Sequence, residues 1–223
     1  MTNKKNYNFV LIGRSGCGKG TQAKLLQEKF GNFYYLSSGA LFRDLSQQDT
    51  VAGNKMKKEM KAGTLPFDTL AVALWMRDIA YNLKEDQGLM LDGAPRRLNE
   101  AIKLDAFIKW LGREKETFII LLDISRQEAF NRLTKRRTCK SCGRLIPWVG
   151  EFKNLKACDL CQGELETRLD DTPEAINNRL DYFEERVVAV IDYFEKKGSL
   201  IKVNGDQPID DVFKDILRAI GEK

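Results

Sequence analysis

The chain has 223 residues, with 43% hydrophobic and 31% charged residues, and it carries a net charge of +5. This composition is typical of a globular protein with one large core or a core with insertions. The absence of histidine excludes histidine chemistry. No apolar stretch reaches the roughly 18 residues of a membrane-spanning helix. The modest positive charge favours anionic ligands without singling out nucleic acid.

Short apolar runs alternate with amphipathic helical patterns along the chain. Strands are predicted at 7–12, 34–36, 89–91, 117–122 and 200–203. Helices are predicted at 19–30, 67–83, 99–111, 126–136, 173–197 and 209–220. This alternation predicts a three-layer α/β fold, in which a five-stranded parallel sheet is flanked by helices.

Two segments break the alternation and are predicted to be insertions into one core. Residues 37–66 carry short helical patterns, and residues 138–171 carry paired cysteines and scattered glycines. The core is then formed by 1–36, 67–137 and 172–223. Insertions that close over a ligand come from the less stable parts of a fold.

Between the first strand and the first helix, residues 13–21 read Gly-Arg-Ser-Gly-Cys-Gly-Lys-Gly-Thr. The pattern G-x-x-x-x-G-K in this context is typical of a loop that binds phosphate groups. Its glycines let backbone amides approach an anion, and the following helix points its positive end at the anion. Lys19 adds a mobile positive charge. We interpret Cys17 as a small space-filling residue, although a loop near a helix N-terminus can also activate a thiol.

Asp92 follows the third predicted strand, in the stretch Leu91-Asp92-Gly93-Ala94-Pro95-Arg96. Ligand groups in open α/β sheets gather outside the carboxyl ends of the strands. Because Mg²⁺ keeps several waters and takes few protein ligands, Asp92 is a candidate to hold the ion through water. The alternative is that Asp92 is a turn residue before Gly93.

Basic residues concentrate in the second half of the chain: Arg132, Arg136, Arg137, Arg168 and Arg179. Arg132 and Arg136 are predicted to share one helix face. In a chain with a phosphate-binding loop, these arginines suit the transfer of a phosphoryl group, although a solvated charged face is the alternative. Asp170 and Asp171 either orient the arginines by charge-assisted pairing or cap the helix that begins near Pro173.

Four of the five cysteines form two C-x-x-C pairs, separated by fifteen residues: Cys139, Cys142, Cys158 and Cys161. This spacing predicts a structural zinc site with four thiolate ligands. Two disulfides are the alternative. They are disfavoured because the first residues lack the long apolar region of a secretion signal, so a cytoplasmic protein with reduced thiols is expected.

Together these features resemble the adenylate kinase family of nucleoside monophosphate kinases over nearly the whole chain. The resemblance is carried by the loop ending Lys-Gly-Thr, by Ser37-Ser38-Gly39 with Arg43, by Asp92-Gly93-Ala94-Pro95-Arg96, and by Thr167–Asp171 with Arg179. It implies a P-loop fold in which 37–66 form a helical monophosphate-binding insertion and 138–171 a zinc-bearing lid. It also implies reversible transfer of a phosphoryl group from MgATP to AMP, giving two ADP.

The resemblance further implies a role for individual residues. The catalytic residues would be Lys19, Arg96, Arg136, Arg168 and Arg179. ATP would be bound by Gly13, Ser15, Gly16, Cys17, Gly18, Lys19, Gly20, Thr21, Arg132, Arg136 and Gln207, with Arg132 near the adenine. The monophosphate would be bound by Ser38, Gly39, Arg43, Leu65, Gly93, Arg96, Glu100, Arg168 and Arg179. A monomer without nucleic-acid or membrane partners is expected.

Some positions depart from the family pattern, above all Glu100, which stands where a base-reading glutamine is usual. Glutamine both donates and accepts, whereas an ionised carboxylate only accepts. A carboxylate pairs better with guanine or cytosine than with adenine, and a protonated Glu100 would restore the fit to adenine. GMP or CMP is therefore an alternative acceptor. A small-metabolite kinase and a zinc-ribbon nucleic-acid binder are further alternatives, but Trp148 and Phe152 alone make a thin stacking platform.

Overall fold

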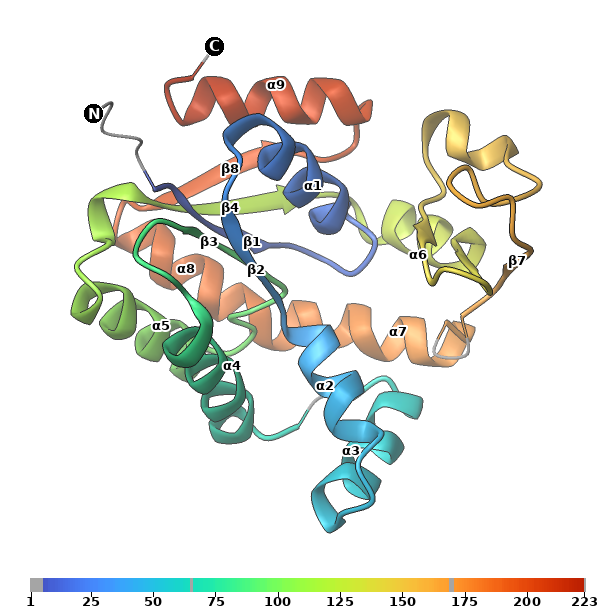
Figure 1. The fold of residues 1–223 in the computed structure, drawn as a ribbon, viewed down its shortest axis with the longest axis horizontal. Helices are drawn as coiled ribbons and strands as arrows, with labels where there is room; N and C mark the ends of the chain where they lie inside the picture. Colours follow the sequence, from blue (N-terminus) through green and yellow to red (C-terminus); the bar gives the residue numbers. More distant parts are fainter. Residues whose placement is uncertain (1–5, 65, 169–170, 223) are drawn as a thin grey trace.

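The computed structural model describes residues 6–64, 66–168 and 171–222. Its centre is a five-stranded parallel sheet in the order β2-β3-β1-β4-β8 (Figure 1). The strands are β1 (Asn8–Ile12), β2 (Phe33–Ser37), β3 (Gly88–Asp92), β4 (Thr117–Asp123) and β8 (Leu200–Asn204). All five strands and the α/β fold class predicted from the sequence are confirmed.

The central strand β1 is buried along its whole length, which explains its continuous apolar run. Successive side chains of a strand point to opposite faces of the sheet. Accordingly, Phe9 and Leu11 belong to the core on one face, while Val10 and Ile12 belong to the core on the other. The sheet is therefore covered by helices on both sides (Figure 1).

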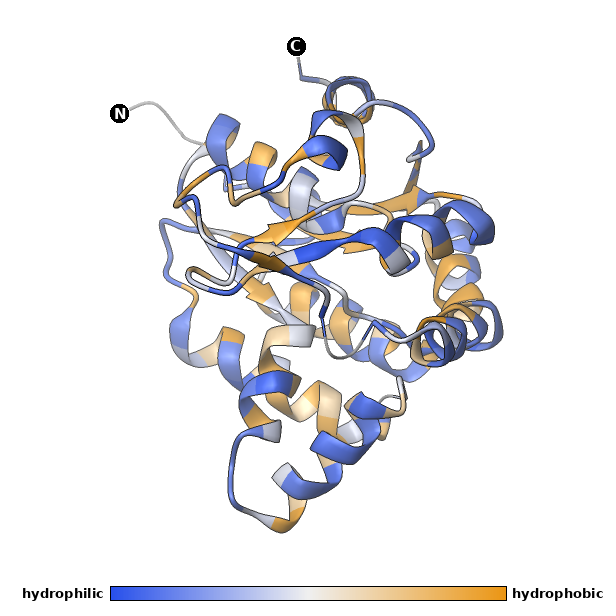
Figure 2. Cartoon of the chain, turned by 90° about the vertical axis from the view of Figure 1, so that its right-hand side faces the viewer, coloured by the Kyte–Doolittle hydropathy of each residue, from blue (hydrophilic) through white to orange (hydrophobic). Residues whose placement is uncertain are grey.

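The larger helices were predicted to within a residue or two. They are α1 (Lys19–Phe30), α4 (Asp68–Asn82), α5 (Leu98–Trp110), α6 (Arg126–Lys135), α7 (Pro173–Tyr182), α8 (Val188–Lys196) and α9 (Ile209–Ala219). One face of the sheet packs against α4, α5 and α8, and the other against α1, α6 and α9. Figure 2 shows hydrophobic residues gathered in the strands and polar residues on the outer helices.

Two details differ from the predicted helices. The helix predicted at 126–136 ends at Lys135, because Arg136 has the extended angles φ −67° and ψ 150°. The helix predicted at 173–197 contains a π-helical segment, Phe183–Val187, between α7 and α8. Such segments are rare and are frequent at functional sites. Among the described residues, no helix is long and apolar enough to cross a membrane.

Two smaller units lie outside the main sheet (Figure 1). Helices α2 (Ser38–Ser46) and α3 (Val51–Lys61) pack on α4 through a small core of Phe42, Met56 and Ala71. After α6, a three-stranded antiparallel sheet forms in the order β6-β5-β7. Its strands are β5 (Arg137–Cys139), β6 (Leu145–Ile146) and β7 (Leu165–Glu166), and no strand was predicted there.

Candidate active site

The phosphate loop connects β1 to α1 at the carboxyl edge of the sheet. Gly13 has φ +149°, and a Cβ atom there would lie 2.5 Å from the Leu122 carbonyl oxygen, so only glycine fits. Gly18 precedes α1 in the left-handed conformation. The Lys19 ammonium group donates to the carbonyl oxygens of Gly13 and Arg14, at 2.9 and 3.0 Å. The sequence therefore places this amine across the loop, beside the positive end of α1.

Cys17 is buried within the core and its sulfur lies 3.5 Å from the Lys19 ammonium nitrogen. It packs with apolar residues of the core on the α1 face of the sheet. This environment agrees with the space-filling interpretation of Cys17.

Asp92 ends β3, next to the phosphate loop. One of its oxygens, Oδ2, accepts a hydrogen bond of 2.9 Å from the Tyr35 hydroxyl. The same oxygen would lie 3.8 Å from a Cβ atom on Gly20 in the first turn of α1. A carboxylate oxygen facing the start of α1 is a suitable partner for the waters of Mg²⁺. Gly93 follows with φ +79°, so Asp92 also begins a turn.

Gly93, Ser38 and Arg96 form a hydrogen-bonded group after β3. The Gly93 carbonyl oxygen accepts from the Ser38 hydroxyl at 2.7 Å and from Arg96 Nε at 2.6 Å. Burial lowers the pKa of Arg96, while the charges of Glu100 and Asp92 act in the opposite direction. On α2, a Cβ atom on Gly39 would lie 3.3 Å from the Arg43 guanidinium. The structure therefore gathers these predicted monophosphate-binding residues on adjacent elements.

Glu100 lies in the first turn of α5 and is only 3% exposed. Its Oε2 atom accepts a 3.0 Å hydrogen bond from the backbone N–H of Arg96, at the helix N-terminus. Burial raises the pKa of the Glu100 carboxyl, against the lowering effect of the Arg96 amide and guanidinium. The Glu100 carboxyl therefore stabilises the start of α5, and it also interacts with the charge of the Arg96 guanidinium.

A buried carboxylate joins two of the predicted arginines. Arg136 and Arg179 both donate to Asp171, whose side chain is fully buried, and the Arg179 contact is 2.6 Å long. Burial lowers the pKa of Arg136, Asp171 raises it, and the positive charges of Arg168 and Arg179 lower it further. Asp171 therefore pairs with the arginines, whereas Thr172 caps α7 through its hydroxyl. Asp170 lies outside the described residues.

Arg136 caps the C-terminus of α6, where its backbone N–H donates to the Arg132 carbonyl oxygen, but the two side chains bind different partners. Arg132 donates to Glu128 at 2.6 Å and to the Gly205 carbonyl oxygen at 3.1 Å. Gln207, just beyond, uses its side chain to bind Asp215. Arg132 is therefore fixed against the loop after β8.

A pocket at the carboxyl edge of the sheet brings predicted residues together. Its lining includes Gly13, Ser15, Lys19, Gly63, Gly93, Arg96, Arg179 and Tyr182. Leu65 lies outside the described residues. Gly63 belongs to the stretch Met60–Gly63 that resembles the return of the monophosphate-binding insertion. The sequence prediction missed Tyr35, Tyr182 and Arg97, of which Arg97 donates to the Pro66 carbonyl oxygen. No motif in the sequence marks these residues, because each of them acts through a contact with a segment that is remote in sequence.

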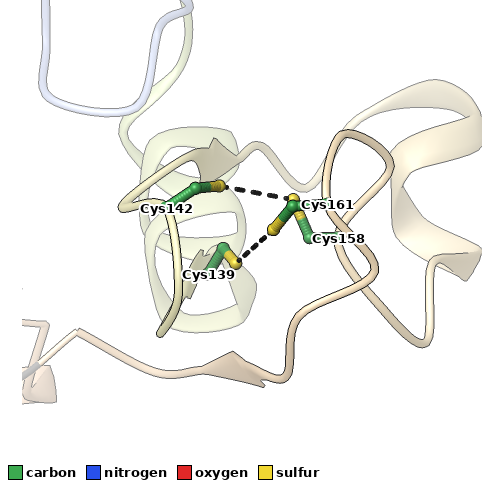
Figure 3. Close-up of side chains that lie close together, drawn as sticks. All are labelled: Cys139, Cys142, Cys158 and Cys161. Atoms are coloured by element: carbon green, nitrogen blue, oxygen red, sulfur yellow. Dashed lines mark hydrogen bonds between the residues drawn. The ribbon is translucent and has the colours of Figure 1, made fainter.

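The four paired cysteines converge in the lid segment (Figure 3). Their sulfur atoms all lie within 4.8 Å of one another, and the cysteines are not joined as disulfides. The Cys139–Cys161 and Cys142–Cys158 sulfur pairs are 3.5 and 3.7 Å apart. Four ligands at a Zn–S distance of about 2.3 Å would place sulfurs about 3.8 Å apart in a tetrahedron. The donor set and its spacing fit zinc.

A phosphate-binding loop opposite buried arginines, at the carboxyl edge of a parallel sheet, defines a nucleotide phosphotransferase of the P-loop class. The model of the adenylate kinase family matches residues 11–199. The chain is 37% identical to an adenylate kinase of Clostridioides difficile, over 96% of this chain and 98% of the relative. It is 38% identical to an adenylate kinase of Methanocella arvoryzae, over 95% and 97%. The chain belongs to the adenylate kinase family.

Proposed function

We propose that this chain catalyses reversible phosphoryl transfer between MgATP and AMP, giving two ADP. The observation that carries the proposal is the arrangement of Lys19, Arg96 and Arg179 around one pocket at the end of the parallel sheet. Phosphoryl transfer requires positioning and cations around the migrating group, with little covalent chemistry from the protein.

We assign the two nucleotides to opposite sides of this pocket. The phosphate loop from Gly13 to Thr21 holds the triphosphate, with Arg132, Arg136 and the backbone at Gln207 on the same side. The monophosphate is held by Arg43 and Arg96, with Ser38, Gly39 and Gly93 close by. Leu65 stays a prediction for this side. Arg168 and Arg179 neutralise the phosphoryl group in transit.

Asp92 holds Mg²⁺ through water, and the ion supplies charge that neutralises the nucleotide phosphates. Tyr35 orients the carboxylate for this task. In the lid, Cys139, Cys142, Cys158 and Cys161 hold a structural zinc ion that takes no part in the chemistry. We also propose that the insertions 37–66 and 138–171 move against the core, and that the protein acts as a cytoplasmic monomer.

The acceptor base is tested with a panel of AMP, GMP, CMP and UMP, each with MgATP, following formation of the diphosphate. We expect AMP to be the best acceptor, because the relatives that match nearly the whole chain are named adenylate kinases. Faster turnover of GMP or CMP would indicate that Glu100 is ionised and accepts a hydrogen bond from an amino group of the base. No turnover of any monophosphate would refute the proposed function.

A further inference from the structure

Arg14, the second residue of the phosphate loop, has no role in the phosphate site as described. Its neighbours Gly13 and Ser15 line the pocket, but Arg14 does not. Its side chain is 17% exposed and reaches the end of β4 and the Phe183 ring beyond α7, and it lines a second pocket together with Asp123 and Ile124. A positive charge on this loop that does not line the phosphate pocket calls for a different explanation.

The Arg14 guanidinium is held by partners from two elements. At the end of β4 it donates to Asp123 Oδ1 at 3.2 Å and to the Ile124 carbonyl oxygen at 3.0 Å. On the π-helical segment it lies 4.4 Å from the centre of the Phe183 ring and 3.6 Å from a Glu184 carboxylate oxygen. The planar guanidinium can donate several hydrogen bonds and stack on an aromatic ring at the same time, whereas a lysine ammonium group has no planar face to stack.

These contacts connect the phosphate loop to the helix that carries a predicted catalytic arginine. Phe183 follows Arg179 by four residues, so the two side chains lie on one face of the helix. Both line the same pocket as Lys19. Arg14 thus ties the glycine-rich loop, whose backbone is intrinsically free, to the face of the helix that presents Arg179.

We propose that Arg14 is a positioning residue, which holds the phosphate loop in its anion-binding shape and in register with Arg179. A loop that already has its binding conformation loses less conformational entropy when the triphosphate binds. The proposal rests on the ATP half of the function proposed above and is independent of the acceptor base.

The test compares Arg14→Ala with Arg126→Ala. Arg126 is a matched control because it also pairs with Glu184, at 3.2 Å, and with Asp181, at 2.7 Å, yet within the described part of the chain it makes no hydrogen bond or ion pair with the loop. Affinity for a non-hydrolysable ATP analogue with Mg²⁺ is measured by calorimetry, together with affinity for AMP and the midpoint of thermal unfolding. We expect Arg14→Ala to weaken analogue binding about tenfold while AMP affinity stays within about twofold. Arg126→Ala should lower the unfolding midpoint and leave analogue affinity unchanged.

A second variant, Asp123→Asn, removes the negative charge of a partner of Arg14 at a position that is 61% exposed, so folding is preserved. Asp123→Asn should also weaken analogue binding, by a smaller factor than Arg14→Ala. The proposal would be overturned if Arg14→Ala left the affinity for the analogue unaltered. It would also be overturned if Arg126→Ala lowered that affinity as much as Arg14→Ala does. Because no acceptor is needed, wild-type protein that binds the analogue but fails to phosphorylate AMP would refute the function and not the role of Arg14.

Discussion

Lys19 supplies the positive charge that the phosphate loop presents to the pocket. We expect Lys19→Ala to keep the fold, because the ammonium group bonds only loop carbonyl oxygens and the Cys17 sulfur. Turnover should fall by about 10² to 10³, since loss of one stabilising donor in a transition state typically costs about 3 kcal/mol or more. The measurement is kcat with MgATP and AMP, beside the thermal midpoint. Near-normal turnover would remove Lys19 from the mechanism.

Glu100 determines how the site reads the acceptor base in our assignment. Glu100→Gln should raise selectivity for AMP over GMP and CMP, because the amide both donates and accepts while its oxygen can still bond the Arg96 amide. A mismatched polar contact with a base is typically worth about 1–3 kcal/mol of discrimination. The ratio of kcat/KM for AMP and GMP is the readout. An unchanged ratio would mean that Ser38 or main-chain groups near Pro66 select the base.

At the scale of elements, Asp171 links the end of the lid segment to the core, because it pairs with Arg136 at the end of α6 and with Arg179 on α7. Asp171→Asn preserves shape but removes the buried negative charge to which Arg136 and Arg179 both donate. Breaking a buried pair in this way costs about 3–5 kcal/mol of unfolding free energy. We expect such a loss in urea denaturation, together with reduced kcat.

The matched control is Glu164→Gln, which removes the charge partner of Lys140 in the same segment, where the two side chains are 72% and 45% exposed. It should cost no more than about 1 kcal/mol, as exposed pairs do. Equal losses for the two variants would show that Asp171 is an ordinary surface partner and not the link between lid and core.

The lid segment should depend on its metal for structure. Its strands β5, β6 and β7 have only two or three residues each, too few to form a core without a further constraint. We expect about one zinc per chain in freshly purified protein, and loss of lid structure on chelation. Elemental analysis without metal, with the four cysteines found in disulfides, would contradict this prediction.

The elements show where prediction from sequence succeeds and where it stops. The five strands were predictable because each is a short, mostly apolar run between helical patterns. The phosphate loop was predictable because its glycine spacing is typical of a backbone that binds phosphate groups. The lid strands were not, since two residues carry no periodicity. The end of α6 before Arg136 and the position of Arg14 also escaped prediction, because both are decided by partners remote in sequence.

For the whole molecule, the buried Glu100 carboxyl makes stability depend on pH. Its pKa is raised in the folded state, so the folded chain binds this proton more tightly than the unfolded chain. Its contribution is complete below the ordinary carboxyl pKa of about 4.3 and is lost as pH rises through the raised pKa. The stability of Glu100→Gln relative to wild type should therefore increase with pH across this window.

The measurement is urea unfolding of both proteins at a series of pH values, with Glu28→Gln as control because its side chain is 58% exposed. The control should show no such trend. A difference between Glu100→Gln and wild type that is constant with pH would mean that Glu100 titrates alike in the folded and unfolded chains.

The register of the central strand has a consequence for how the chain folds as it is synthesised. Phe9 of β1 pairs with Met90 of β3 and with Phe118 of β4, so both partners of this strand emerge from the ribosome long after it does. Pairing between such distant segments slows folding, because the chain must lose conformational entropy in closing a long loop before strand pairing can stabilise it. Until β3 and β4 have been translated, this strand, which is apolar apart from Asn8, has no partner. The nascent chain therefore exposes apolar surface that favours aggregation until both partner strands are available.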